Sequence, residues 1–289
     1  MQKKNTTIRN SLPLLPSLLV LLVFFVGPVV LGLYYSLTNL AITGTNAKNF
    51  SFIGFENYIR MFQDQAVVRS IGHTVVFTLG SIIGQTVIGF GIAYLMRSCS
   101  RGFRRVIGGI VMLGWIMPEM VAAYCMSSMF QDNGTLNLIL GLFHVEKIAW
   151  LYDYPMLSVL IANVWRGTAF SMLAYQAALD DVSSEVEESA KLDGTNWFTH
   201  IVHIILPSIK GTLMTNTMLI TLMTLGSFGL IWIMTGGGPS GKTQTLPIMM
   251  YITAFKNAQM GYGVAICMLS LVLGVIFGLI YVKIEGRNS

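Results

Sequence analysis

Four long stretches of this sequence contain no charged residue, and they constrain the fold more than any other feature. They lie between Arg9 and Lys48, between Arg69 and Arg97, between Lys210 and Lys242, and between Lys256 and Lys283. Each stretch is longer than the ~20 residues that a helix needs to cross a lipid bilayer. Only 11% of the residues are charged, whereas soluble domains contain about 25%. The sequence therefore predicts an integral membrane protein.

Two further apolar stretches, each with one charge, complete the expected set of membrane spans. We expect an all-α fold in one transmembrane domain covering residues 1–289. The six expected helices lie at about residues 11–38, 70–96, 106–130, 154–179, 211–235 and 257–282. Basic residues precede the first span, but its apolar region is too long for a signal peptide and no cleavage site follows it. The first span is therefore expected to remain as a helix.

The positive net charge is explained by membrane topology and gives no reason to expect a nucleic-acid partner. With six spans, most lysines and arginines fall on the side of the N-terminus, and they are concentrated in the short loop at Arg97–Arg105. Short cytoplasmic loops carry such an excess of basic residues. Both termini are therefore expected in the cytoplasm.

A charged segment at residues 180–208, between the fourth and fifth expected helices, has the pattern of two short helices. Ser184-Glu-Val-Glu187 fits a capping box at a helix start, and Gly194 suits the end of that helix. Apolar residues then recur at helical spacing from Trp197 until Pro207. The first helix is acidic, whereas helices that lie on a membrane surface usually carry Lys and Arg on their polar face. Docking to a partner protein is therefore favoured over lying on the membrane.

This segment resembles the cytoplasmic coupling loop of the permease subunits of binding-protein-dependent ABC importers. The family motif reads Glu-Ala-Ala, three residues, Gly, and later Leu-Pro, and this sequence has Glu188-Ser-Ala-Lys-Leu-Asp-Gly194 followed by Leu206-Pro207. Ser189 stands where the motif has Ala. Other segments resemble carbohydrate-uptake permeases of the larger maltose-type and glycerol-phosphate-type family: Phe52–Tyr58, Pro118–Ala123, Gly134–Asn137, Trp165–Phe170, and Thr235–Pro239 with Thr243–Leu246.

The resemblance implies a permease subunit in the inner membrane of a prokaryote, with no catalytic activity of its own. It implies a second permease subunit, a cytoplasmic ATPase dimer that binds ATP and Mg, an extracytoplasmic binding protein and a carbohydrate substrate. No cofactor is expected on this chain, and its membrane-spanning helices are expected to contact lipid. The residues implied to dock on the ATPase are Glu188, Ser189, Ala190, Asp193, Gly194, Leu206 and Pro207.

Glu119 and Arg166 are the charges inside the third and fourth expected spans. A charge at that depth normally faces a partner or a water-filled cavity. The two residues could form an ion pair, Arg166 could contact an acidic solute, or the two charges could be hydrated separately.

The fifth expected span carries hydroxyls along one side, at Thr217, Thr221, Thr224 and Ser227. They could bond within their own helix or line a pore. The resemblance to maltose-type permeases adds the substrate-path candidates Gly167, Phe170, Met223, Thr224 and Ser227.

Three other patterns limit the possible functions. Gly236–Thr243 matches the letters of a P-loop, but no strand precedes it and the residues after it start a helix poorly, so no nucleotide site is expected. Histidines and cysteines are scattered, so neither an enzyme nor a metal site is indicated. Gly80-x-x-x-Gly84 and Gly274-x-x-x-Gly278 suggest close helix packing within the chain. Alternatives that remain are a permease for glycerol phosphate or another small polar solute, and a secondary transporter.

Overall fold

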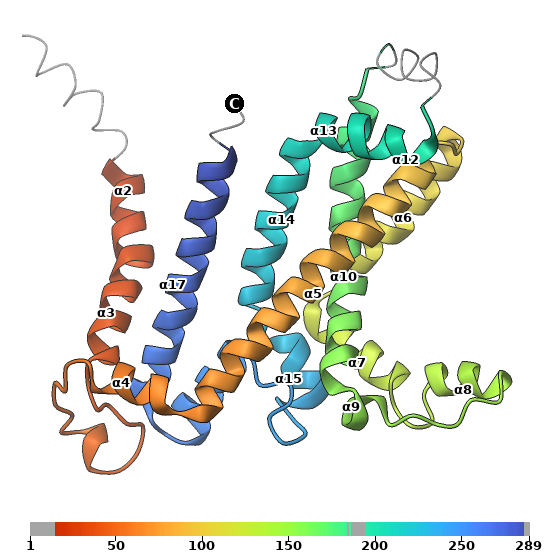
Figure 1. Cartoon of the computed structure of the whole chain (residues 1–289). Coiled ribbons are helices and arrows are strands. Elements are labelled where there is room, and N and C mark those ends of the chain that lie inside the picture. The colour runs from red at the N-terminus through yellow and green to blue at the C-terminus, as the bar shows by residue number, and fades with distance from the viewer. Residues whose placement is uncertain (1–14, 184, 186–194, 286–289) are drawn as a thin grey trace, which may run out of the picture. The chain divides into compact units, whose positions relative to one another are not determined.

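The computed structural model describes residues 15–183, 185 and 195–285, and over these residues every regular element is a helix. The β pairing in this part of the chain is an isolated bridge between Thr38 and Phe52. The all-α prediction is therefore confirmed (Figure 1). The chain forms two compact units, Met1–Val67 with Met250–Leu269 and Val68–Met249 with Ser270–Ser289.

Within the described residues, four helical spans are long and apolar enough to cross a membrane, and the number rises to six if each of two bent pairs counts as one span. The first span combines α2 (Leu15–Leu21), the π-helix η2 (Leu22–Val26) and α3 (Gly27–Ser36). The other three are α5 (Gln65–Met96), α10 (Pro155–Asp180) and α17 (Met260–Glu285). These four agree with the first, second, fourth and sixth expected spans.

The third expected span is broken in the middle. The structure has α6 (Arg101–Ile116) and α7 (Glu119–Met129), and the two helices meet at 99°. Pro118 lies at the break, and a proline drives the residue before it out of the helical region. Met117 accordingly has ψ 128. The expected helix over residues 106–130 is therefore two helices in the structure.

The fifth expected span is also broken. It consists of α14 (Lys210–Leu225) and α15 (Gly229–Thr235), which meet at 51°. Gly226 and Ser227 lie in the linker, and both are weaker helix formers than the Leu, Met and Ala that continue a helix. The sequence expectation of one helix at 211–235 overlooked this break.

In the first unit, the Phe52–Tyr58 segment closes the end of the first span. Asn57 is buried in α4 (Glu56–Gln63) and its Nδ2 donates to the carbonyls of Ser36 and Thr38, both at 2.8 Å. The hydroxyl of Tyr58 lies 2.7 Å from that of Ser36. The last carbonyls of a helix lack partners within it, so Asn57 satisfies groups that would otherwise be orphaned. This unit also contains η3 (Thr45–Ala47) and η5 (Ile252–Lys256).

In the second unit, α5 and α10 approach closely through glycines. A Cβ on Gly80 would overlap Leu160, and a Cβ on Gly84 would overlap Val164. The first small-residue pair therefore packs within the chain, as the sequence predicts. Gly274 and Gly278 have no described atom within 4 Å of an added Cβ, so packing within this chain is not seen for the second pair.

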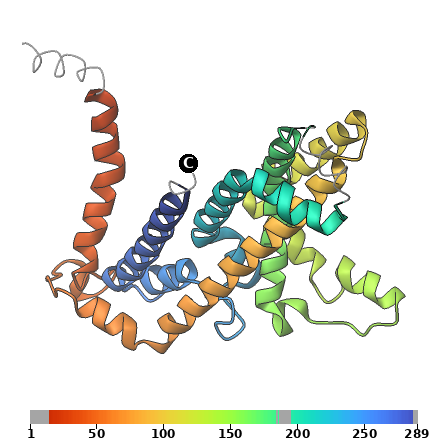
Figure 2. The same ribbon diagram turned by 45° about the horizontal axis from the view of Figure 1, so that its top comes forward.

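The short elements of the second unit gather at the two ends of α10. At its start lie α8 (Thr135–Leu142) and α9 (Trp150–Asp153); after its end come α12 (Trp197–His200), the π-helix η4 (Ile201–Ile205) and α13 (Leu206–Ser208). Figure 2 shows the α12–α13 segment and the α8–α9 segment separated along α10. Another short helix, α16 (Leu246–Tyr251), contains the residues at which the chain passes from the second unit to the first.

Candidate solute cavity and coupling segment

A cavity of about 230 Å³ lies in the second unit where both broken spans meet α5 and α10. All the substrate-path residues predicted from the sequence line it, although they come from three separate segments of the chain. They are Glu119, Arg166, Gly167, Phe170, Met223, Thr224 and Ser227. The sequence reasoning missed the other lining residues, which are Gln85, Trp115, Asn163, Ile220 and Gly226.

One wall of the cavity is aromatic. Trp115, at the end of α6, and Phe170, on α10, are stacked with ring centroids 5.5 Å apart and an angle of 27° between their planes. Such rings offer a flat apolar surface. The wall can therefore accept the apolar face of a ring-shaped solute.

A second wall carries amide side chains. Gln85 of α5 is buried and its Nε2 donates to the carbonyl of Asn163 at 3.3 Å, while Asn163 Nδ2 donates to Ser81 Oγ at 2.8 Å. Gly167 makes this arrangement possible, because a Cβ there would overlap the amide of Gln85. Amides inside apolar spans are a signal in the sequence that would have found Gln85 and Asn163.

Glu119 is the first residue of α7 and joins the two broken spans. Its Oε1 accepts a hydrogen bond from the backbone amide of Leu230, near the start of α15, at 2.9 Å. The first amides of a helix have no partner inside it, and a carboxylate is favourable there. Helices α7 and α15 also pack against each other. Glu119 therefore acts in this structure as a cap on a neighbouring helix.

Arg166 has no such partner in the structure. Its side chain makes no hydrogen bond or ion pair with any described residue, Glu119 included, and its Nε is buried without an acceptor. Of the arrangements left open by the sequence, the Glu119–Arg166 ion pair is thus absent from the structure. A guanidinium is always charged, so Arg166 presents donors and a positive charge at the cavity wall.

The hydroxyls of the fifth expected span divide into two groups. Thr217 donates to Leu213 O at 2.7 Å and Thr221 donates to Thr217 O at 2.8 Å, both within their own helix. Thr224 and Ser227 line the cavity. Bonding within the helix therefore accounts for Thr217 and Thr221, and a pore-lining role stays a prediction for Thr224 and Ser227.

The described part of the segment at residues 180–208 contains its second helical stretch. Asn196 Oδ1 accepts from the amide of Thr199 at 2.8 Å and caps α12. The π-helix η4 precedes Pro207, which belongs to α13 together with Leu206. A proline has no N–H and clashes with the carbonyl four residues earlier, and a wider π turn relieves that clash. The helical stretch thus continues through Pro207 and ends at Ser208, close to the end that the sequence predicts, and α14 begins at Lys210.

The remaining predicted docking residues, Glu188, Ser189, Ala190, Asp193 and Gly194, lie outside the described residues, as does the capping box at Ser184–Glu187 except for Glu185. No geometry is assigned to them.

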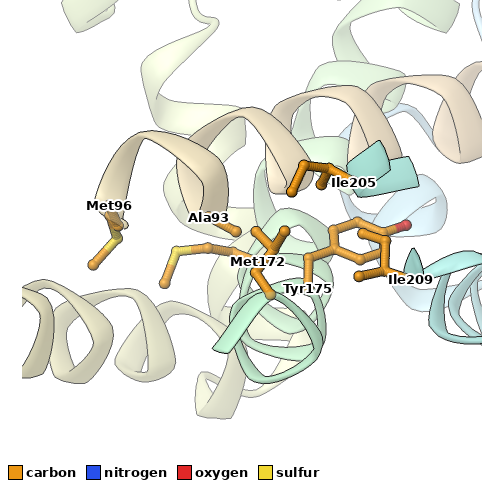
Figure 3. Packing of buried hydrophobic residues seen from close by; sticks show 7 residues of the cluster. Ala93, Met96, Met172, Tyr175, Ile205 and Ile209 are labelled. Atoms are coloured by element: carbon orange, nitrogen blue, oxygen red, sulfur yellow. The ribbon is translucent and has the colours of Figure 1, made fainter. Parts of the chain in front are cut away.

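We call the stretch Trp197–Ile209 the coupling segment, and its C-terminal part is seated in an apolar cluster. Ile205 and Ile209 are buried against side chains of α5 and α10, as Figure 3 shows for most of them. The cluster consists of Ala93, Met96, Met172, Tyr175, Leu179, Ile205 and Ile209. By contrast, Trp197 and Phe198 are 67% and 65% exposed. The segment is thus held at one end and presents aromatic side chains at the other.

The start of the segment at residues 180–208 is also fixed. Arg104 of α6 donates through Nη2 to both carboxylate oxygens of Asp180, at 2.7 and 2.5 Å. Asp180 is the last residue of α10. This ion pair ties the end of α10 to α6, so Asp180 is not available as a free acidic group for a partner.

Three comparisons place the chain among known proteins. The profile of a family described as "Binding-protein-dependent transport system inner membrane component" matches residues 85–289. The chain is 30% identical over 279 residues to the trehalose/maltose transport system permease protein MalF of Thermococcus litoralis, covering 96% of this chain and 92% of that protein. It is 28% identical over 290 residues to the multiple sugar-binding transport system permease protein MsmF of Streptococcus mutans, covering 95% and 94%.

The fold is similar to that of solved transporters. A chain of a bacterial ABC transporter involved in the import of the acidic polysaccharide alginate superposes with a TM-score of 0.80 at 20% identity, covering 99% of this chain and 96% of that chain. At this identity the likeness concerns the fold alone.

Proposed function

Because the chain belongs to the family of binding-protein-dependent transport system inner membrane components, we propose that it imports a carbohydrate as one of two permease subunits. In this proposal it forms half of the pore of an ATP-driven importer and has no catalytic activity. Relatives that align over nearly their whole length are named as sugar-transport permeases, which supports the choice of solute class.

The observation that carries the proposal is the cavity at the junction of the two broken spans. Transporters build solute sites at interruptions of membrane helices, because backbone groups freed there become available. A mostly apolar site with a few directing polar groups is typical for small ligands. Here Trp115 and Phe170 supply the apolar face, and Gln85, Asn163 and Thr224 supply hydrogen-bonding groups. A pyranose ring, which has an apolar face and a rim of hydroxyls, fits this chemistry.

The proposed partners follow from the family. A second permease would complete the pore, an extracytoplasmic binding protein would deliver the sugar, and two ATPase subunits would bind ATP and Mg on the cytoplasmic side. Glu188–Gly194 and Leu206-Pro207 would dock in the ATPase, with both termini in the cytoplasm, as the basic loop at Arg97–Arg105 favours. The seating of Ile205 and Ile209 supports this role, because a rigid segment transmits a displacement that a loose loop would absorb.

Uptake by the reconstituted assembly tests the proposal. The complex is placed in lipid vesicles with its binding protein outside and ATP inside, and accumulation of labelled sugar is followed. Phe170→Leu should raise the sugar concentration needed for half-maximal rate, because it removes one ring of the aromatic wall while the side chain stays apolar. Thr217→Val is the matched control, since that hydroxyl bonds within its own helix. Uptake driven by an ion gradient without ATP would refute the proposal.

A glycerol phosphate or another small anionic solute is the second candidate, and the free guanidinium of Arg166 favours it. Competition for uptake by a panel of neutral sugars and phosphate esters separates the two. Inhibition by the esters alone would replace the carbohydrate assignment.

A further inference from the structure

A buried hydrogen-bond network joins α14 to α10 beside the coupling segment. Asn216 of α14 donates through Nδ2 to the hydroxyl of Tyr175 at 2.7 Å and to that of Ser171 at 3.1 Å, both on α10. Asn216 is 2% exposed, and Tyr175 and Ser171 are 0% exposed. Each of these polar groups would be costly at this depth without its partner.

The network lies between the coupling segment and the cavity. On one side, the Tyr175 ring belongs to the cluster that seats Ile205 and Ile209 (Figure 3). On the other side, Ser171 directly follows Phe170 of the aromatic wall, and Asn216 is one helical turn before Ile220, which also lines the cavity. Helices α10 and α14 are thus joined by the network, both line the cavity, and α10 also contacts Ile205 and Ile209 of the coupling segment.

Apolar contacts between two membrane helices are not directional, so they resist sliding of one helix along the other only weakly. A hydrogen bond joins two defined atoms and is lost when one helix slides far enough along the other. A slide of α14 by one helical turn is about 5.4 Å and would carry the Asn216 amide out of hydrogen-bonding range of both hydroxyls. The Asn216 amide therefore fixes the register of α14 on α10.

We propose that Asn216 is a positioning residue that transmits displacement of the coupling segment to the cavity walls, by holding α14 in register with α10. The inference rests on the proposed function, in which this segment docks on the ATPase. When ATP binding moves the segment, Ile205 and Ile209 push on Tyr175, and the bond from Asn216 makes α10 and α14 move together. Without that bond the segment moves while the cavity walls lag behind, so ATP is hydrolysed without transport.

The test measures ATP hydrolysed per sugar transported, using the complete assembly in vesicles with its binding protein. Tyr175→Phe removes one hydroxyl and leaves the ring in the cluster, and Asn216→Leu removes the amide at similar volume. We expect the ratio for Asn216→Leu to rise about fivefold, the factor that corresponds to one buried hydrogen bond of ~1 kcal/mol. Tyr175→Phe should raise it less, and the double variant should be no worse than Asn216→Leu. Thr217→Val, next to Asn216, should leave the ratio unchanged.

A purely structural role would lower the melting temperature of the variants and leave the ATP-to-sugar ratio at its wild-type value, and that result would overturn the inference. If Asn216→Leu fails to assemble, the ATP-to-sugar ratio of Tyr175→Phe still distinguishes the two roles. Absence of ATP-driven uptake by the wild-type assembly would instead refute the proposed function itself, and the inference with it.

Discussion

Replacement of Glu119 separates its role as a helix cap from a role as a charge partner. In Glu119→Leu the amide of Leu230 loses its acceptor, at a break where α15 has no earlier turn to supply one. A hydrogen bond to a charged group contributes about 1.5–3 kcal/mol. A loss of ~2 kcal/mol lowers the ratio of molecules with α15 packed on α7 to molecules with α15 detached from it by about 30-fold. Gly226 and Ser227 precede α15 and line the cavity, so detachment of α15 should displace them and lower the affinity for sugar.

Glu119→Gln is the variant to compare with Glu119→Leu, because the amide oxygen of Gln can still accept a hydrogen bond from the backbone amide of Leu230. We expect it to retain most of the wild-type uptake, with a cost of ~1 kcal/mol for exchanging a charged acceptor for a neutral one. The assay is the initial rate of ATP-driven uptake over a range of sugar concentrations, together with thermal melting of the assembly. If Gln were as damaging as Leu, and if exchange of the charges at Glu119 and Arg166 restored uptake, the capping account would be refuted in favour of an ion pair.

Three further variants test separate parts of the structure. Gly167→Ala should displace the amide of Gln85 at a cost of about 1–3 kcal/mol and slow uptake, while assembly measured by size-exclusion chromatography persists; unchanged uptake would count against the amide wall. Asn57→Leu should lower the melting temperature, since two buried carbonyls at the end of α3 lose their donor at about 2 kcal/mol, with uptake per folded complex preserved; an unchanged melting temperature would contradict the cap. Glu188→Lys combined with Gly194→Pro should weaken co-purification of the ATPase by about tenfold or more, and retained uptake would show that the docking assignment is wrong.

The sequence predicts the membrane-spanning character of this chain well because that character follows from composition alone. A charge-free stretch such as Arg69–Arg97 has few alternatives to a buried or lipid-facing helix. The resemblance likewise named Phe170 and Thr224 as substrate-path candidates before any geometry was known. Both line the cavity, and their contact with a solute stays a prediction.

The breaks in the spans were harder to predict. Pro118 was visible in the sequence, but prolines are tolerated inside membrane helices. Pro28 in the first span shows this, because it stands in the first turn of α3, directly after the π-helix η2, and the helical span is not interrupted there. Whether a proline bends a helix depends on the neighbouring groups that satisfy the freed backbone. At Pro118 the bend brings Glu119 to the start of α15, a contact 111 residues away in sequence that no local pattern records. Local sequence patterns likewise did not decide whether Glu119 and Arg166 form an ion pair, because the partner of Glu119 is distant in the sequence.

The measurement that tests the central claim most directly is purification of this chain, tagged and expressed in its native host, under gentle detergent conditions, with identification of the proteins that accompany it. The account predicts that a nucleotide-binding ATPase and a second membrane permease co-purify with it. Reproducible recovery of the folded chain alone, or only with copies of itself, would contradict the account.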